Sequence, residues 1–374
     1  MAPRTLEQAT ASHDNGFNLV RLVCATLVVV FHAFPLNSAR PGASDPVSPL
    51  LAPHTDLGAL AVGVFFLISG IFISQSWERD PHLGRYLLRR VARIVPGLFV
   101  CLLLTTALAV GLFSSAGWRG MLAPAPWRYI VDNTALHWLR YIIPPEQLTL
   151  PGVLNGETLN GPLWTLYWEG RMYVVVALVG LAAALPLRTW MRGAALFLLA
   201  AANLFPDVIG GYVWETRLWS LFLTGMLLHT LARDLRIGWR HVACALALAG
   251  LNWTRWAALT PNPLTWFGIL LVAATLALAV GSLRLPVAAH LQRHDYSYGI
   301  YIYHWPVLLM LRTAFAPLGH WRLLALGLLV TGVLAVLSWH LVEAPALRTV
   351  RRLLRRNARE ALAGATPARP RERA

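Results

Sequence analysis

The stretch FNLVRLVCATLVVVFHAFPL, residues 17–36, decides the fold class of this chain. A helix needs about 20 mostly apolar residues to cross a lipid bilayer, and this run has that length. It is too long for the apolar core of a cleaved signal peptide, so we expect it to be retained. Two ionisable side chains, Arg21 and His32, lie within it. The sequence therefore predicts a transmembrane helix that carries two polar groups into the membrane.

The composition of the whole chain points the same way. Of 374 residues, 57% are hydrophobic and 13% are charged, whereas a soluble domain carries about a quarter charged residues. The net charge of +15 comes from short arginine clusters between apolar runs and from the C-terminal tail. This pattern is typical of basic loops beside membrane lipids and argues against nucleic acid as a partner. The three cysteines lie in apolar runs and imply neither disulfides nor a metal site.

Apolar runs of spanning length recur along the chain. We therefore predict an all-α, polytopic membrane protein with about ten transmembrane helices. The predicted spans are residues 17–36, 57–77, 95–113, 168–186, 190–206, 217–232, 241–257, 263–281, 297–315 and 321–341.

The arginines predict how these spans are oriented. With the N-terminus in the cytoplasm, 22 of the 32 basic residues fall in segments on the cytoplasmic side, and 8 fall outside. Basic residues favour cytoplasmic loops, so both termini are predicted to be cytoplasmic. The long segment 114–161, rich in Trp and Pro, is then extracytoplasmic and could cover or bind an acceptor. We divide the chain into a transmembrane domain, residues 1–348, and a basic cytoplasmic tail, residues 349–374, that is disordered at its end.

Arg21 and His32 are candidates for function because ionisable groups inside a membrane are costly. They are eleven residues apart, so on a helix they share one face and lie roughly 16 Å apart along the axis. Arg21, near the cytoplasmic mouth, could hold a phosphate of an acyl-coenzyme A. His32, in the outer half, could act as general base on an acceptor hydroxyl. The alternatives are that Arg21 reaches lipid headgroups and that His32 is a packing residue.

Other clusters leave similar alternatives open. A stripe of Arg85, Arg89 and Arg93, with Arg90 beside it, precedes Pro96 and could bind either coenzyme A phosphates or anionic lipid. Glu169 enters a predicted span and could orient His32 or pair with an arginine. The aromatic residues around His304 could line a groove for a sugar or lipid, or could simply pack.

These residues together resemble the acyltransferase-3 family of bacterial membrane O-acyltransferases. The similar motifs occur in the family's order and cover nearly the whole chain. They are Arg21 with His32; Phe65–Phe72, which contains Ser69; Arg89–Pro96; Leu163–Tyr173, which contains Glu169; Ser297–Pro306, which contains His304; and Glu343–Pro345.

The resemblance implies a multi-pass enzyme of the bacterial inner membrane that moves an acyl group, often acetyl, from cytoplasmic acyl-coenzyme A to a hydroxyl of an extracytoplasmic carbohydrate or lipid-linked glycan. It implies no tightly bound cofactor and no metal. The implied catalytic residues are His32, Arg21 and Glu169. The implied donor contacts are Arg21, Arg85, Arg89, Arg90, Arg93 and Ser69, and the implied acceptor contacts are Trp164, Tyr173, Tyr298, Tyr301 and His304. Alternatives are a small-molecule acceptor, a succinyl donor, or a multispan transporter.

Overall fold

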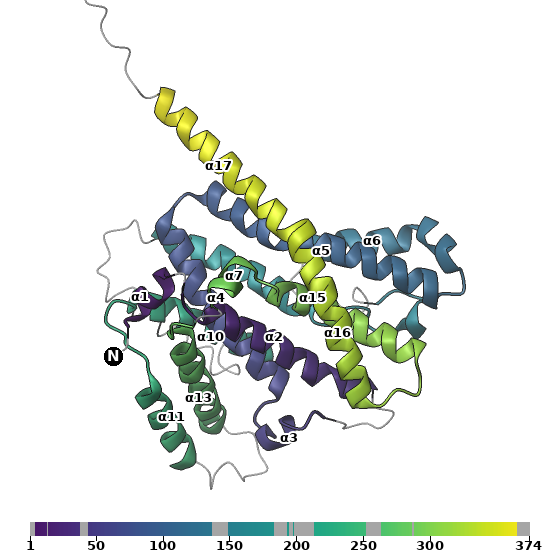
Figure 1. Cartoon of the computed structure of the whole chain (residues 1–374), viewed down its shortest axis with the longest axis horizontal. Helices are drawn as coiled ribbons and strands as arrows, with labels where there is room; N and C mark the ends of the chain where they lie inside the picture. Colours follow the sequence, from purple (N-terminus) through teal and green to yellow (C-terminus); the bar gives the residue numbers. More distant parts are fainter. Residues whose placement is uncertain are drawn as a thin grey trace, which may run out of the picture.

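The computed structural model describes residues 4–12, 14–37, 44–136, 149–182, 193, 197, 213–251, 263–285 and 288–364. Within these residues the chain is helical, and its only β-structure consists of isolated bridges. Figure 1 shows the long helices packed as one bundle, from which α17 projects. The prediction of an all-α protein is confirmed for this part of the chain.

The predicted spans correspond closely to helices. Nine of them overlap α2 (Phe17–Ala33), α4 (Leu57–Arg79), α5 (Leu83–Phe113), α7 (Leu163–Ala182), α10 (Val213–Thr230), α11 (Trp239–Leu251), α13 (Pro263–Gly281), α15 (Ser297–Ala314) and α16 (His320–Ser338). Apart from residues 193 and 197, the predicted span 190–206 lies outside the described residues. Four described segments are long and apolar enough by themselves to cross a membrane: Phe17–Asn37, Leu57–Arg79, Leu83–Phe113 and His320–Asn357. The chain therefore has the character of a membrane protein, and the count of ten spans stays a prediction.

Shorter elements connect or extend these helices. They are α1 (Leu6–Ala11), η1 (Pro35–Asn37), α3 (Ser48–Leu51), η2 (Gly117–Leu122), α6 (Pro124–Thr134), η4 (Leu154–Gly156), α14 (Ala288–Arg293), the π-helical turn η5 (Trp339–Glu343) and α17 (Ala344–Gly364). Because α16, η5 and α17 follow one another directly, the predicted tail from residue 349 is helical as far as Gly364. The boundary predicted at residue 348 therefore falls inside α17.

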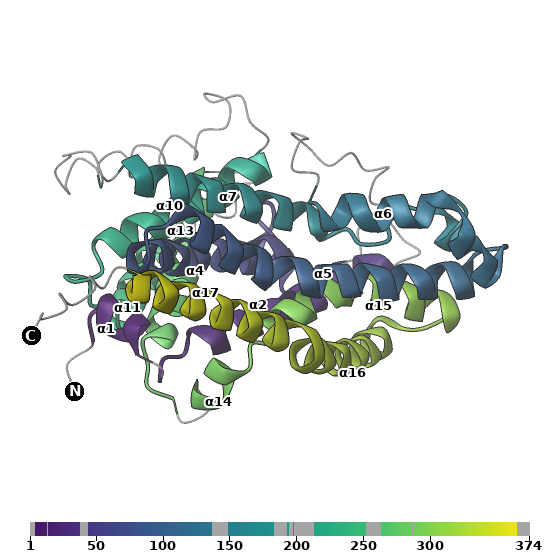
Figure 2. The ribbon, with the colours of Figure 1, turned by 90° about the horizontal axis from the view of Figure 1, so that it is seen from above.

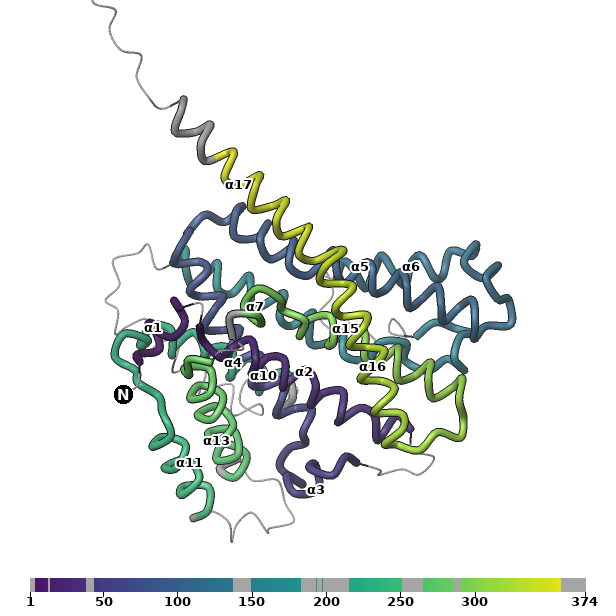
Figure 3. Tube along the Cα trace, in the orientation of Figure 1, coloured from purple at the N-terminus to yellow at the C-terminus, as the bar shows by residue number. Residues whose placement is uncertain are grey.

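The helix with the two polar groups, α2, lies centrally in the bundle. It packs against α4, α13, α15 and α16. Figure 3 shows the path of the chain through α2 and these neighbouring helices. Its buried side chains include Phe17, Val20, Val28 and Val29. Arg21 and His32 are therefore held by neighbouring helices rather than turned to surrounding lipid.

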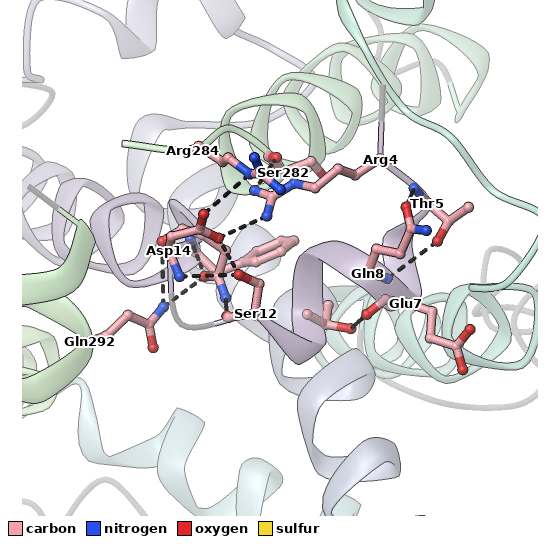
Figure 4. A network of polar contacts seen from close by, with 12 residues as sticks. Arg4, Thr5, Glu7, Gln8, Ser12, Asp14, Ser282, Arg284 and Gln292 are labelled. Carbon is pink, nitrogen blue, oxygen red and sulfur yellow. Dashed lines mark hydrogen bonds and ion pairs between the residues drawn. The ribbon is translucent and has the colours of Figure 1, made fainter. Parts of the chain in front are cut away.

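Segments predicted to be cytoplasmic meet at one end of the bundle, as Figure 4 shows for the N-terminus. Arg4 forms an ion pair with Asp14 at 2.8 Å and donates a hydrogen bond to the carbonyl of Ser282, also at 2.8 Å. The backbone N–H of Leu6 donates to the carbonyl of Leu235 at 2.7 Å. These contacts fix the segment before α2 against the segments that follow α10 and α13.

Segments predicted to be extracytoplasmic meet at the other end. The Arg312 guanidinium donates to the carbonyl of Leu36 at 2.6 Å and pairs with the carboxylate of Glu157. Trp305 Nε1 donates to the carbonyl of Thr158 at 2.8 Å. Figure 2 shows α6, which belongs to the same outer segment, packed beside α5 at this end. The connecting segments named here thus lie in two groups at opposite ends of the bundle, and the alternation and orientation of the spans stay predictions.

Helices α4 and α10 approach each other closely at two glycines, Gly70 and Gly225. A Cβ atom at Gly225 would lie 2.1 Å from the carbonyl oxygen of Leu67, and one at Gly70 would lie 2.2 Å from that of Phe222. Small residues permit such close backbone approach between membrane helices. Any larger side chain at either position would therefore separate the two helices.

We expect Gly225→Ala to destabilise the protein by about 1–3 kcal/mol, because the new methyl group would overlap backbone atoms that cannot move aside alone. Gly250→Ala is the matched control, since Gly250 also lies in a helix and a Cβ there would meet nothing within 4 Å. Thermal unfolding of both variants in the same detergent compares them directly. Equal unfolding temperatures would show that the close contact between α4 and α10 is not as described.

Candidate active site

His32 lies on the wall of a cavity of about 460 Å³ inside the bundle. The cavity is bounded by α2, α4, α7, α10, α13 and α15 and by residues of the outer segment before α7. Its wall is largely apolar and aromatic, with Trp164, Tyr301 and Trp305 among the lining residues and with the charged residues Asp56 and Arg217 also present. Such a size and lining are typical of sites that bind small molecules.

The imidazole of His32 has a defined orientation. Its Nδ1 lies 2.9 Å from Nε2 of His304, and the two rings are nearly coplanar, with 14° between their planes. Trp305 packs edge-on against His32 with 4.9 Å between ring centroids. His304 itself is fully buried, and its Nδ1 lies 2.6 Å from the carbonyl oxygen of Tyr301. His304 thus contacts His32 but does not itself line the large cavity in the described structure.

Pro306 helps to place α15 against the outer segment. A proline within a helix has no N–H to donate to the carbonyl four residues earlier, which here belongs to Ile302. That carbonyl instead accepts hydrogen bonds from Asn160 Nδ2 at 3.0 Å and from the Cys101 thiol at 3.3 Å. The proline therefore creates an attachment point for the segment that covers the large cavity.

A second, smaller cavity of about 50 Å³ adjoins the first. Arg21, Ser69 and Glu169 lie on its wall. The two cavities share Val62, Thr165 and Tyr301, and the hydroxyl groups of Thr165 and Tyr301 are 2.5 Å apart. Arg21 and His32 therefore belong to adjoining cavities that a hydrogen-bonded pair of side chains separates.

Arg21 is not an isolated cation. It pairs with Asp295 at 2.8 Å, and Arg93 pairs with the same carboxylate at 2.6 Å and with Glu343 at 3.2 Å. Burial alone would raise the pKa of Asp295, but the charges of Arg21 and Arg93 and hydrogen bonds from Ser297 outweigh it and lower that pKa to about 2. Asp295 therefore remains a carboxylate at neutral pH and joins α2 to α5 through their arginines.

The rest of the basic stripe is also engaged. Asp80 accepts hydrogen bonds from Arg85 and Arg89 at 2.6–3.0 Å, and those from Arg85 chiefly hold the pKa of Asp80 at about 2. Arg90 donates to Ser76 at 3.2 Å and lies over the ring of Tyr86. An incoming phosphate would therefore compete with carboxylates for these arginines.

Of the other predicted site residues, Trp164 lines the larger cavity, Ser69, Glu169 and Tyr298 line the smaller one, Tyr301 lines both, and Tyr173 and His304 line neither. Glu169 lies beside the smaller one and accepts a hydrogen bond from Tyr173 at 2.7 Å, while the partner of His32 is His304. Tyr298 lines the smaller cavity and donates to the carbonyl of Ile94 at 2.8 Å. In the residues described, no cluster of three His, Cys, Asp or Glu side chains is placed to hold a metal ion.

The sequence alone did not identify Asp80 and Asp295 as the partners of these arginines. Only 17 residues are acidic against 32 basic ones, so an aspartate within a basic connecting segment is a signal for a specific arginine partner. The pairing of His32 with His304 had no such signal, because 272 residues separate the two.

The apolar helices and the two adjoining internal cavities define a membrane protein with an internal site. The chain belongs to acyltransferase family 3, since its residues 14–341 match that family's acyltransferase domain. Nodulation protein 10 of Rhizobium leguminosarum bv. viciae is 29% identical over 367 residues, covering 91% of this chain and 95% of the relative. The O-acetyl transferase of Shigella phage Sf6 is 28% identical over 345 residues, covering 88% of this chain and 95% of the relative. No solved structure matches. The protein is therefore an acyltransferase, which displaces the transporter alternative.

Proposed function

We propose that this acyltransferase moves an acyl group, acetyl in the first instance, from cytoplasmic acyl-coenzyme A to a hydroxyl of an extracytoplasmic carbohydrate. The observation that carries the proposal is the pair of adjoining cavities, one with Arg21 and the other with His32 on its wall. Donor and acceptor can then approach from opposite ends and meet near His32.

The smaller cavity is the proposed donor side. Arg21 lies at the end of the bundle where the segments predicted to be cytoplasmic meet, which suits a donor supplied from the cytoplasm. The narrow space around Ser69 and Glu169 suits the thin acyl-bearing arm of coenzyme A better than a sugar. For the thioester to reach His32, the hydrogen bond between Tyr301 and Thr165 must open.

The larger cavity is the proposed acceptor side. Residues of the outer segment, including Thr158 and Gly161, contribute to its wall. Aromatic faces such as Trp164 together with the charged groups of Asp56 and Arg217 provide the mixed apolar and polar contacts that a sugar ring uses. A surface polysaccharide or its lipid-linked precursor is the acceptor that we favour, and the O-acetyl transferase among the relatives supports transfer to oxygen.

His32 supplies the proposed chemistry as a general base. It takes the proton from the acceptor hydroxyl while the oxygen attacks the thioester carbonyl. The new carbon–oxygen bond forms, the carbon–sulfur bond breaks, and the coenzyme A thiolate leaves. The imidazolium of His32 then returns its proton to the thiolate, which gives an ester and free coenzyme A.

Release of the coenzyme A thiol by the purified protein tests the donor directly. We expect thiol release from acetyl-coenzyme A that depends on an added glycan fragment, and slower release from succinyl-coenzyme A. A preference for succinyl-coenzyme A would revise the acyl group. Absence of acceptor-dependent release with every glycan tried would refute a carbohydrate acceptor and favour a small molecule.

Arg21→Ala is expected to raise the KM for the acyl donor about 10- to 100-fold, because a charge-assisted hydrogen bond contributes about 1.5–3 kcal/mol. Arg21→Lys should retain part of the affinity, since a point charge lacks the two-pronged geometry of guanidinium. Arg4→Ala is the control, because Arg4 forms its ion pair at the same end of the bundle but lines neither cavity. An unchanged donor KM in Arg21→Ala would contradict a role in donor binding.

A further inference from the structure

We propose that His304 is a positioning residue that fixes the tautomer of His32. In this tautomer Nδ1 carries the proton, and Nε2 is bare, that is, unprotonated and able to act as the base. The inference rests on the proposed function only for its consequence in catalysis. The tautomer itself follows from two contacts of the described residues and from the charge of His304, taken in order from the backbone outward.

The first contact fixes the proton on His304. Its Nδ1 lies 2.6 Å from the carbonyl oxygen of Tyr301. A carbonyl can only accept a hydrogen bond, so Nδ1 of His304 must carry a hydrogen. The fully buried position of His304 keeps its ring in this arrangement.

The second step concerns the charge of His304. Neither of its hydrogen-bond partners in the described structure is a carboxylate, and a buried, unpaired imidazolium would be costly. His304 is therefore neutral, and a neutral imidazole with a protonated Nδ1 has a bare, accepting Nε2.

The second contact, between His304 and His32, transfers this constraint to His32. Because Nε2 of His304 is bare and lies 2.9 Å from Nδ1 of His32, the hydrogen between them must belong to His32. The near-coplanar rings allow this hydrogen bond to lie in the plane of both imidazoles. The contacts of His32 in the described structure include no carboxylate, so His32 is neutral for the same reason as His304. Its Nε2 is then bare and is the atom able to take a proton, and His32 lies on the wall of the large cavity.

The arrangement also serves the charged state of His32. When Nε2 takes the proton of the acceptor hydroxyl, Nδ1–H remains bonded to His304, whose bare nitrogen accepts from the new imidazolium. When the coenzyme A thiolate receives the proton, Nε2 becomes bare again and the same tautomer is restored. Without His304, either nitrogen of His32 could hold the proton, and part of the enzyme would lack a base.

A matched pair of variants separates positioning from packing. His304→Gln keeps an accepting oxygen near the position of Nε2, whereas His304→Met fills similar space with a thioether that accepts only weakly. We expect His304→Met to lower kcat about 10- to 100-fold, the usual cost of losing such a supporting hydrogen bond. Both KM values should stay unchanged, and His304→Gln should recover most of the rate. Equal losses in the two variants at equal unfolding temperatures would overturn the proposal.

Nitrogen-15 NMR of histidine-labelled protein reads the tautomer without any substrate. The His32 signals are assigned by their loss in His32→Gln. We expect a protonated Nδ1 and a bare Nε2 for His32 in the wild-type protein, and a mixture of tautomers in His304→Met. A protonated Nε2 in the wild type would overturn the inference. Because this spectrum involves no acyl transfer, failure to find a donor or acceptor would count only against the proposed function.

Discussion

His32→Ala is expected to lower turnover by about 10²–10⁴-fold, the range that a general base typically contributes. The reason is geometric: His32 lies on the cavity wall and is held by His304 at 2.9 Å and by the edge of Trp305. The fold should tolerate the change, because His32 is only half-buried and forms no ion pair in the described structure.

The measurement is thiol release from acetyl-coenzyme A by detergent-purified protein, with the amount of folded protein matched by size-exclusion chromatography. His229→Ala provides the control, since His229 pairs with Glu78 at 2.8 Å and lines neither cavity. Full turnover in His32→Ala would show that His32 is not the general base. Equal losses of turnover in His32→Ala and His229→Ala would indicate a general effect of histidine removal.

Asp295→Asn is expected to be among the most destabilising single substitutions in the chain. It keeps the size of the side chain but leaves Arg21 without its counter-ion and Arg93 with Glu343 alone. The side chains of Asp295 and Arg93 are 11% and 16% exposed, so the arginines cannot turn freely to water. Removing one partner of a buried ion pair typically costs about 3–5 kcal/mol.

Asp80→Asn is the matched control for that loss, because Asp80 also joins two arginines but Arg85 is 43% exposed. Exposed pairs contribute about 0–1 kcal/mol, so this variant should unfold almost as the wild type does. Chemical unfolding of both variants in one detergent gives the comparison. Equal losses of free energy of unfolding would contradict a structural role for the cluster around Asp295.

The pH dependence of the Asp295 contribution has a defined sign. Its folded pKa of about 2 lies below the usual value near 3.9 for an unfolded aspartate. The carboxylate therefore contributes its full stability above about pH 4 and loses that contribution as the pH falls through 2. The difference in unfolding free energy between wild type and Asp295→Asn should accordingly be constant from pH 7 to about pH 5.

The spans were predictable because hydropathy is a local property. An apolar run such as residues 57–77 predicts a helix from its own composition, and the observed helix α4 extends beyond that run only to Arg79. The helical periodicity that placed Arg21 and His32 on one face was equally local, and both side chains indeed line adjoining cavities. Pro96 lies inside α5 rather than at its start, because neighbouring helices can satisfy backbone groups that a proline frees in a membrane helix.

The partners of the polar groups were not predictable in the same way. Spacing shows which way a side chain points, but Asp295 is 274 residues from Arg21 in sequence. The stripe of Arg85, Arg89 and Arg93 looked available for phosphates because its carboxylate partners come from outside the helix. Such pairings depend on how helices pack, which the hydrophobic pattern of one sequence does not specify.

The central claim is acyl transfer to an extracytoplasmic carbohydrate with His32 as the base. Proton NMR of surface glycans from cells that carry the wild-type protein, His32→Ala or no protein tests it most directly. We predict acyl signals and shifted sugar-ring protons with the wild type only, and the shifted protons would identify the modified position. Identical spectra from all three cell types would contradict a surface carbohydrate as the acceptor, and acyl signals that persist with His32→Ala would contradict the role of His32.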